Sequence, residues 1–475
     1  MTTGQLCLTM SRLALDMSGS PVNYTSKRRP ASAQMSLEWS AGTGVDSQAD
    51  SKSKRRPKLL LLAWTFPPAA SIASVRTWNL AKHLSRLGWK VTVVTPDPVL
   101  VRHIENPEQT KADLEAEEIS QILTGHDFQF LDPGFLNYRN EGLRWLLGGI
   151  CRKISQRFGI SRGIGWIRPA ERACQSLSPE NVDLILASGP AFASFVLAER
   201  LSKRLGRPYI LDYRDPWWTE VTGMLRIFQG LIDKLERRLV AGSQAVIVVS
   251  TSWASDLDRR FNIRPKLHVI TNGYDPEDFA DVKPHNFGHF AMVYTGIFYP
   301  PIRIIAPLLA ALKQLKQKET SRQWCFHYYG ENDEYVKNEA EKIGVTDRVK
   351  VHGKVPRATA LSAVKGANVA VVIASVSSAC SPEISGWIPA KLYEAVGLHT
   401  PVLLIAPPGS DAESIAKSTG LIRRFTGDET DKIARFLEES ITGIEIKRED
   451  ADSITWNCLA HQFDHVLRQQ LVPAP

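Results

Sequence analysis

Short apolar strands alternate with amphipathic helices along this chain, and that alternation restricts its fold more than any other feature. KLLLLAWTFPP (58–68) predicts a buried strand followed by a loop, residues 71–88 predict a helix, and VTVV (91–94) predicts the next strand. A strand, a helix and a strand within about 35 residues form a βαβ unit, which requires parallel strands and covers both faces of the sheet. The chain is therefore predicted to be an α/β protein.

The pattern runs through the chain in two series, which predicts two domains. Further strands of the first series are expected at DLILAS (183–188), PYILDYRD (208–215), AVIVVS (245–250) and LHVITNG (267–273). After a polar segment with Pro and Gly, the second series has strands at HFAMVYTG (289–296), WCFHYYG (324–330), RVKVHG (348–353), NVAVVIAS (368–375) and PVLLI (401–405). We predict two facing Rossmann-like parallel-sheet domains with a cleft between them.

These series fix the expected domain limits. The first domain is predicted at 58–275, a linker at 276–288, and the second domain at 289–450. The final segment, 451–475, contains the amphipathic helix SITWNCLAHQFDHVLRQQL, which has no strand of its own domain left to cover. We therefore expect this helix to cross back and pack on the first domain.

Half of the formal net charge comes from the first 57 residues. The chain of 475 residues has a formal charge of +8, and residues 1–57 contain eight Lys and Arg against four Asp and Glu. This segment is rich in Ser, Thr, Ala and Gly and has no sustained apolar period, so it is predicted to be a disordered basic tail. With the charge concentrated there, no nucleic-acid partner is expected.

The sequence does not predict an integral membrane protein, because it has no run of roughly 18 apolar residues. GLRWLLGGICRKISQRFG (142–159) is amphipathic and has Arg152, Lys153 and Arg157 near its end. It fits a helix that covers the sheet, or a peripheral contact with an anionic membrane surface. The expected location is the cytoplasm, with this membrane contact on the inner face as an alternative.

Neither a disulfide framework nor a metal site is predicted. The six cysteines form no C-x-x-C pair and no Cys and His group with zinc-finger spacing. Asp256 and Asp258 lie two apart on an expected helix, where they point to different faces. The other Asp-x-Asp pair, at 450 and 452, lies in a charged surface run.

Polar and glycine residues follow several predicted strands, where parallel sheets bind ligands. Glycine permits close backbone approach, and free amide groups at helix starts bind anions, so these positions favour phosphate recognition. The sequence contains no G-x-x-x-x-G-K-[ST] loop, no G-x-G-x-x-G after a strand and no G-x-S-x-G elbow. The usual signatures of P-loop hydrolases, dinucleotide oxidoreductases and serine hydrolases are therefore absent.

Seven motifs in order resemble one known family. They are FPPAASIASVRTWNLAKHLSRLGWKVTVVTPD, LILASGPAFAS, YILDYRDPWW, VITNGYDPEDF, VYTGIFYPPIR, VKVHGKVP and IPAKLYEAVGLHTPVLLI. Over residues 58–471 they look like the retaining nucleotide-sugar glycosyltransferases of family 4 type, which have the two-domain GT-B architecture. The resemblance implies transfer of a sugar, with retention, from a nucleoside diphosphate to a hydroxyl of a lipid-linked glycan or polysaccharide. It implies no cofactor other than this donor.

The resemblance also implies roles for individual residues. Glu394 matches the ribose-binding glutamate of the family, and a carboxylate can accept both hydrogens of a ribose diol. Arg303 and Lys391 are candidates for stabilising the departing diphosphate, and Gly296 would keep its loop close to the phosphates. Glu383 is the nearest acid upstream of Glu394 in this region. These five residues form the expected donor site.

The acceptor side of the expected cleft is assigned to the first domain. Asp215 is the catalytic candidate, either contacting the acceptor or orienting Arg214. Retaining transfer in this family resembles a front-face displacement, in which the leaving phosphate helps to deprotonate the acceptor, so no protein nucleophile is required. The remaining cleft candidates are Pro68, Ser71, Asn272 and Gly273.

Three positions depart from the family pattern. The family often has a glutamate eight positions before its ribose-binding residue, where this chain has Gly386. Ala69, Ala70 and Ser71 replace the usual Gly-Gly after the first strand, and residues 188–190 stand where a histidine is often found. Two alternatives therefore stay open: a catalytically degenerate nucleotide-sugar-binding protein on the same fold, and a nucleotide-sugar 2-epimerase.

Overall fold

The computed structural model describes residues 55–69, 72–100, 104, 106–127, 163–220, 229–318, 322–417, 419–443 and 452–471. Within the expected basic tail, only residues 55–57 belong to these ranges. Ser71 and the amphipathic segment 142–159 lie outside the described residues. The chain from Arg55 onward forms one compact unit.

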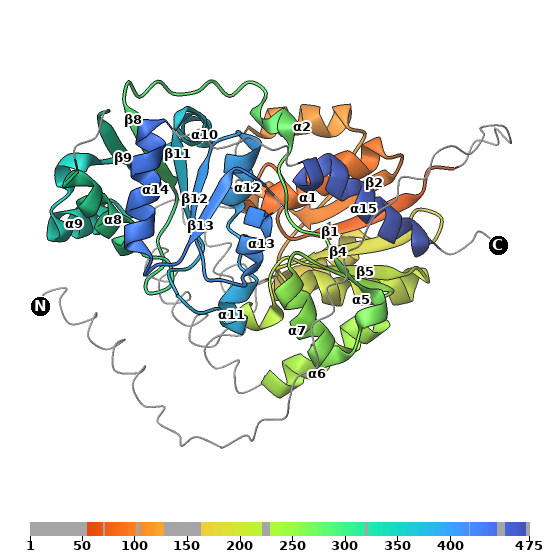
Figure 1. The fold of residues 1–475 in the computed structure, drawn as a ribbon. Helices are drawn as coiled ribbons and strands as arrows, with labels where there is room; N and C mark the ends of the chain where they lie inside the picture. Colours follow the sequence, from red (N-terminus) through yellow and green to blue (C-terminus); the bar gives the residue numbers. More distant parts are fainter. Residues whose placement is uncertain are drawn as a thin grey trace, which may run out of the picture. The chain divides into compact units, whose positions relative to one another are not determined.

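The first domain is built on a seven-stranded parallel sheet with the order β3-β2-β1-β4-β5-β6-β7. Its strands are β1 (Lys58–Ala63), β2 (Lys90–Pro96), β3 (Ser120–Thr124), β4 (Leu184–Gly189), β5 (Tyr209–Tyr213), β6 (Ala245–Val248) and β7 (Leu267–Val269). The helices that accompany it are α1 (Ile72–Arg86), α2 (Pro107–Ala116), α4 (Ile167–Ala173), α5 (Ala193–Leu205), α6 (Gln229–Gly242) and α7 (Thr251–Phe261) (Figure 1).

The second domain has a six-stranded parallel sheet with the order β10-β9-β8-β11-β12-β13. Its strands are β8 (Phe290–Thr295), β9 (Trp324–Tyr329), β10 (Val349–Val351), β11 (Val369–Ile373), β12 (Val402–Ile405) and β13 (Ile422–Phe425). Its helices are α8 (Ala306–Lys316), α9 (Asp333–Ile343), α10 (Arg357–Gly366), α11 (Pro382–Ser385), α12 (Ala390–Gly397), α13 (Asp411–Lys417) and α14 (Thr430–Thr442).

Strand burial shows why the continuous apolar runs form these sheets. In β1, Leu60 and Leu62 pack into the core on one face of the sheet, while Leu59 and Leu61 pack into the core on the other. All four side chains are almost fully buried. A strand with both faces covered needs apolar residues at every position, which is the pattern that the sequence has.

The last helix, α15 (Trp456–Gln469), packs on α1 of the first domain, as predicted. Its Trp456 and Phe463 side chains are buried in the same core as the apolar face of α1. The Trp89 indole donates to Asp464 at 2.6 Å, and Arg468 donates to the Leu87 carbonyl at 2.9 Å. Figure 1 shows α15 beside α1, although the two helices lie at opposite ends of the described chain.

The order of the strands in each sheet indicates where the expected cleft lies. The order reverses between β1 and β4 in the first sheet and between β8 and β11 in the second. A crevice forms at such a switch point, outside the carboxyl ends of the strands. The predicted fold class, two Rossmann-like domains with a cleft between them, is confirmed. The domain limits 58–275 and 289–450 stay predictions.

Candidate active site

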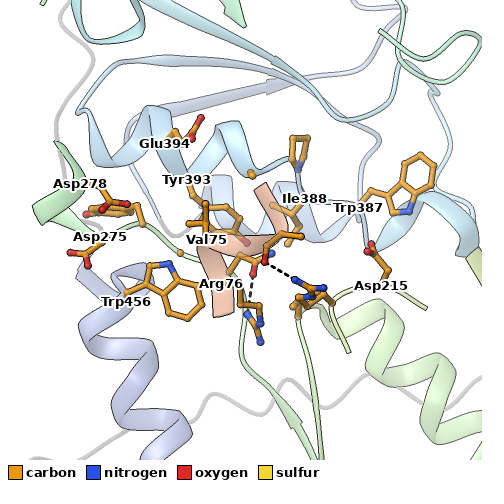
Figure 2. Close-up of a pocket in the computed structure, with 18 of the residues that line it drawn as sticks. Val75, Arg76, Asp215, Asp275, Asp278, Trp387, Ile388, Tyr393, Glu394 and Trp456 are labelled. Atoms are coloured by element: carbon orange, nitrogen blue, oxygen red, sulfur yellow. Dashed lines mark hydrogen bonds between the residues drawn. The ribbon is translucent and has the colours of Figure 1, made fainter. Parts of the chain in front are cut away.

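A cavity of about 320 Å³ lies between the two domains. Elements of both sheets contribute to its wall (Figure 2). The first domain supplies side chains from α1, from α7 and from the loops after β4, β5 and β7, and the second domain supplies the loop before α8, the start of α10 and the region around α12. The polar, glycine and tryptophan residues of the wall include Arg214, Asp215, Trp253, Asn272, Gly273, Arg303, Arg357, Gly386, Glu394 and Trp456.

Helix α12 positions the predicted donor-binding side chains. Leu392, Tyr393, Ala395 and Val396 of this helix are buried against its domain. Lys391 and Glu394 are three residues apart and therefore lie on the same side of the helix. The helix ends at Gly397, where an added Cβ atom would lie 2.5 Å from ring atoms of both Tyr274 and Phe279. Glycine at this position lets the segment that joins the domains pack on α12.

Glu394 lines the cavity and is paired with a cation. Its Oε1 atom accepts a hydrogen bond from Arg357 Nη2 at 2.8 Å, and the carboxylate side chain is 19% exposed. Figure 2 shows Glu394 projecting from its helix at one side of the cavity. A partly exposed ion pair contributes only about 0–1 kcal/mol to stability, so it leaves the carboxylate available to a ligand.

Lys391 and Gly296 are brought into direct contact. Gly296 follows β8 with φ +118°, and a Cβ atom there would lie 1.5 Å from Lys391 Nζ. Glycine is thus required for the backbone conformation and for the space that the lysine occupies. Burial and the nearby Arg303 guanidinium lower the pKa of Lys391 to about 8. Neither Lys391 nor Gly296 lines the cavity itself; they lie beside the part of its wall that Arg303 forms.

Arg303 lies in the loop before α8 and lines the cavity. Its guanidinium carbon lies 5.5 Å from the centroid of the Tyr299 ring. Within the described part of the chain, neither Arg303 nor Lys391 forms an ion pair with a carboxylate. Burial is the main cause of the lowered pKa of Lys391, and repulsion by the Arg303 charge lowers it further. An anion bound between them would remove this repulsion.

Three buried N–H donors in the cavity wall have no hydrogen-bond partner among the described residues. They are Arg303 Nε and the indole nitrogens of Trp253 and Trp456. A buried donor without an acceptor costs about 1–3 kcal/mol, so each favours a ligand oxygen. Neither tryptophan was predicted from the sequence as a site residue. The available signal was position, since Trp253 lies at the start of the helix that follows β6.

Arg214 joins two segments of the first domain at the cleft. Its guanidinium is buried and donates to the carbonyl oxygens of Gly189 at 3.2 Å, Ala73 at 2.6 Å and Pro190. These bonds fix the loop after β4 against the start of α1. Asp215 follows directly and also lines the cavity. In Figure 2 it lies on the opposite side of the cavity from Glu394.

Asn272 and Gly273 lie on the first-domain side of the same cavity. Asn272 Oδ1 accepts from Arg76 Nη1 at 3.0 Å, and Arg76 also forms a buried ion pair of 2.7 Å with Asp212. A Cβ atom at Gly273 would lie 2.2 Å from the Ile454 carbonyl oxygen. A side chain at position 273 would therefore overlap the segment that leads from the second domain back to α15.

The remaining predicted residues are not in this cavity. Pro68 lines an adjoining cavity of about 420 Å³, which shares Val75, Asp278 and Arg357 with the first. Glu383 lies in α11, but its side chain is outside the described part of the structure, as is all of Ser71. The structure thus brings Asp215, Arg214, Asn272, Gly273, Arg303 and Glu394 into one cavity, and places Lys391 and Gly296 beside it.

Trp253 occupies the space beside Gly386, the position at which the family often has a second acid. A Cβ atom on Gly386 would lie 2.3 Å from Trp253 Nε1 and 2.5 Å from two further atoms of the indole. Any larger residue at 386 would displace this tryptophan, which comes from the other domain. Among residues 188–190, which stand where the family often has a histidine, Ser188 is buried and donates to Asp212 at 2.8 Å. Pro190 of the same stretch lines the cavity.

Replacing Gly386 with alanine is expected to destabilise the protein by about 1–3 kcal/mol, because the new methyl group overlaps the Trp253 ring. Urea unfolding measures this change. Gly230→Ala is the matched control, since a Cβ atom on this helical glycine meets nothing within 4 Å. Adding Trp253→Phe to Gly386→Ala should recover part of the loss. Equal stability of Gly386→Ala and the wild type would contradict this packing.

Two facing parallel-sheet domains with a polar, cation-bearing cavity between the carboxyl ends of their strands define the GT-B class of glycosyltransferase folds. Residues 73–278 match the family described as Glycosyltransferase Family 4. The match bears out the resemblance over these residues, which include most of the first domain. No curated protein sequence matches the chain significantly.

Solved structures with the same fold include three transferases or synthases. A glycosyltransferase from Rickettsia africae has a TM-score of 0.55 at 13% identity, over 89% of this chain and 100% of that one. Sucrose-phosphate synthase from Thermosynechococcus elongatus has 0.56 at 16%, over 87% and 99%. The apo form of the lipopolysaccharide outer core galactosyltransferase WaaB has 0.51 at 12%, over 87% and 100%. These likenesses establish the fold, and with the family match they support a glycosyltransferase.

Among the described residues, no helix is both long and apolar enough to cross a membrane.

Proposed function

We propose that this protein transfers a sugar from a nucleoside diphosphate to a hydroxyl group of an acceptor, with retention of configuration. The observation that carries the proposal is the pair of cations, Lys391 and Arg303, next to Gly296 at the carboxyl end of β8. Within the described chain neither has a carboxylate partner, and Glu394 lies one helical turn from Lys391. A diphosphate joined to a ribose fits this arrangement of charges.

The donor is proposed to bind with its diphosphate at Arg303 and Lys391 and its ribose at Glu394. When the bond between sugar and phosphate breaks, negative charge grows on the departing diphosphate. Two fixed, largely buried cations stabilise this charge in the transition state more than they stabilise the ground state. Catalysis requires such a difference. Because these side chains supply the positive charge, the proposal includes no cofactor other than the donor.

The acceptor is proposed to attack from the side of the sugar that the diphosphate leaves. A bond forms between the acceptor oxygen and the anomeric carbon while the bond from that carbon to the phosphate oxygen breaks. The proton of the acceptor hydroxyl passes to the departing phosphate, so no protein nucleophile is needed. Asp215, across the cavity from Glu394, is proposed to hold the acceptor hydroxyl (Figure 2).

We propose a lipid-linked glycan or a polysaccharide as acceptor, as in the biosynthesis of a cell-envelope glycan. The adjoining cavity, lined by Trp78, Asn79 and Gln109, offers an aromatic ring and amide groups for further sugar units. Action in the cytoplasm, at the inner face of a membrane through residues 142–159, belongs to the same proposal. Those residues lie outside the described structure.

A catalytically degenerate binding protein is the second candidate. The observation in its favour is Gly386, where Trp253 takes the space of the second acid that is frequent in the family. Such a protein would keep the diphosphate and ribose contacts without turnover. A 2-epimerase is disfavoured, since it needs acid and base side chains around the sugar, and no such pair is assigned among the described residues of the cavity.

The test is a turnover assay with the full chain, a panel of UDP-, GDP- and ADP-sugars, and polyprenyl-linked glycans or oligosaccharides as acceptors. NMR of the product reads the configuration of the new bond. The expected result is transfer with the donor's anomeric configuration retained. Saturable donor binding without transfer to any acceptor would favour the degenerate binding protein, and an inverted product would contradict the mechanism.

A further inference from the structure

A group of imidazole rings and a thiol lies toward the amino-terminal ends of β8 and β9, away from the cavity. His289 directly precedes β8, and Cys325 and His327 are the second and fourth residues of the neighbouring strand β9. One ligand atom from each of the three residues lies within 4.8 Å of the others. Because alternate residues of a strand share a face, Cys325 and His327 project from the same side of the sheet.

We propose that His289, Cys325 and His327 bind one divalent transition-metal ion of the zinc class. Two imidazole nitrogens and a thiolate are the donors that zinc prefers, and a water molecule would complete a tetrahedral set. The Nε2 atoms of His289 and His327 lie 2.9 Å apart. Tetrahedral zinc with bonds of about 2.1 Å separates two nitrogens by about 3.4 Å, so a small opening of this pair is required.

Each histidine also has a hydrogen-bond partner outside the group of three. His327 Nδ1 lies 2.9 Å from His352 Nε2, and the His289 ring has a hydrogen bond to the backbone of Phe287. Such contacts hold a proton on one ring nitrogen and direct the other nitrogen toward a metal. The Cys325 thiol lies 3.4 Å from the Arg348 carbonyl oxygen, in a weak contact that metal ligation would replace.

Cys325 and His327 are buried, so water and other cations have little access to them. His327 is 3% exposed and Cys325 is 6% exposed, while His289 is partly exposed and gives an entry route.

The proposed site would have a structural role. His289 ends the segment that joins the two domains, and the Phe287 ring of that segment lies 4.5 Å from the His327 ring. A metal held by His289 and β9 would fasten this segment to the sheet. The site lies toward the amino-terminal ends of β8 and β9, and the donor cavity lies at their carboxyl ends. Metal binding here is therefore independent of the proposed function.

Cobalt(II) titration of chelator-treated full-length protein tests the proposal. We expect one cobalt ion per chain, with visible bands of tetrahedral intensity and a near-ultraviolet band from thiolate ligation. Cys325→Ser should remove the near-ultraviolet band, and His289→Gln should weaken binding by at least about tenfold. His289 is partly exposed, so its variant is informative even if Cys325→Ser fails to fold. Cys458→Ser and His461→Gln on α15 are the matched controls and should bind cobalt as the wild type does.

Zinc should also raise the melting temperature of the wild type and of both controls, but not that of His289→Gln. If the wild type held no more metal than the His289→Gln variant does, the proposal would be overturned. A thiolate band that persists in folded Cys325→Ser would overturn it too, because another cysteine would then be the ligand.

Discussion

Replacing both Lys391 and Arg303 with methionine is expected to weaken binding of the donor nucleotide by about 100-fold or more. Each charged hydrogen bond to a phosphate contributes about 1.5–3 kcal/mol, and this variant removes both cations while keeping unbranched apolar side chains. Isothermal titration calorimetry with the nucleoside diphosphate measures the change. Lys316→Met is the control, because Lys316 lies on α8 and pairs with Asp347. Unchanged affinity in the double variant would remove both residues from the donor site.

The pH dependence of donor affinity provides a second measurement on Lys391. Its pKa in the free protein is about 8, below the ordinary value of 10.5. A bound diphosphate favours the charged ammonium, so affinity is expected to be highest below pH 8 and to fall by up to about tenfold per pH unit above it. Lys391→Met alone should bind weakly with no such decline.

A stability measurement distinguishes a loss of donor binding in Lys391→Met from unfolding of this variant. Because the pKa of Lys391 is lower in the folded chain than in the unfolded chain, the folded state holds the ammonium unfavourably below pH 8. This cost disappears as the pH rises toward the unfolded value. At neutral pH, Lys391→Met should therefore be at least as stable as the wild type, and urea unfolding checks this.

Glu394→Gln is expected to reduce donor affinity by about 10- to 100-fold. The amide cannot accept both hydrogens of the ribose diol as the carboxylate does, and charged hydrogen bonds contribute about 1.5–3 kcal/mol. Calorimetry should compare the nucleotide with its 2′,3′-dideoxy analogue. The wild type should prefer the nucleotide with the intact diol, and Glu394→Gln should discriminate poorly between the two.

Arg357→Gln is the control for the ion pair of Glu394. It removes the 2.8 Å contact but leaves the carboxylate in place, so donor affinity should stay close to that of the wild type. An equal loss of affinity in both variants would show that the ion pair itself matters. Full diol discrimination in Glu394→Gln would rule out ribose recognition by this residue.

Much of the fold was predictable because its parallel strands are buried on both faces. β1 and β12 are continuous apolar runs, and such runs stand out in a sequence. The edge strands β3 and β13 were not predicted. β3 has partly exposed residues along most of its length, and β13 reads IRRF, with two arginines in four residues. Edge strands commonly have polar residues, and the apolar signal is then lost.

The candidate site was predictable where strand position or a family motif indicates a residue. Asp215 was expected at the carboxyl end of a parallel strand, Arg303 and Glu394 were expected from the family resemblance, and all three line the cavity. Contacts between segments far apart in the chain have no local signal in the sequence. The packing of Trp253 on Gly386 and the insertion of Lys391 against Gly296 join segments far apart in the chain, and only the tertiary structure places them together.

A thermal-shift screen of the full chain with UDP-, GDP- and ADP-sugars tests the proposed donor site most directly, since a ligand that binds the folded state raises its melting temperature. We predict a saturable increase with one nucleotide class, matched by its free nucleoside diphosphate and lost when Lys391 and Arg303 are both methionine. No increase with any of these compounds, or an equal increase in the double variant, would contradict the donor site.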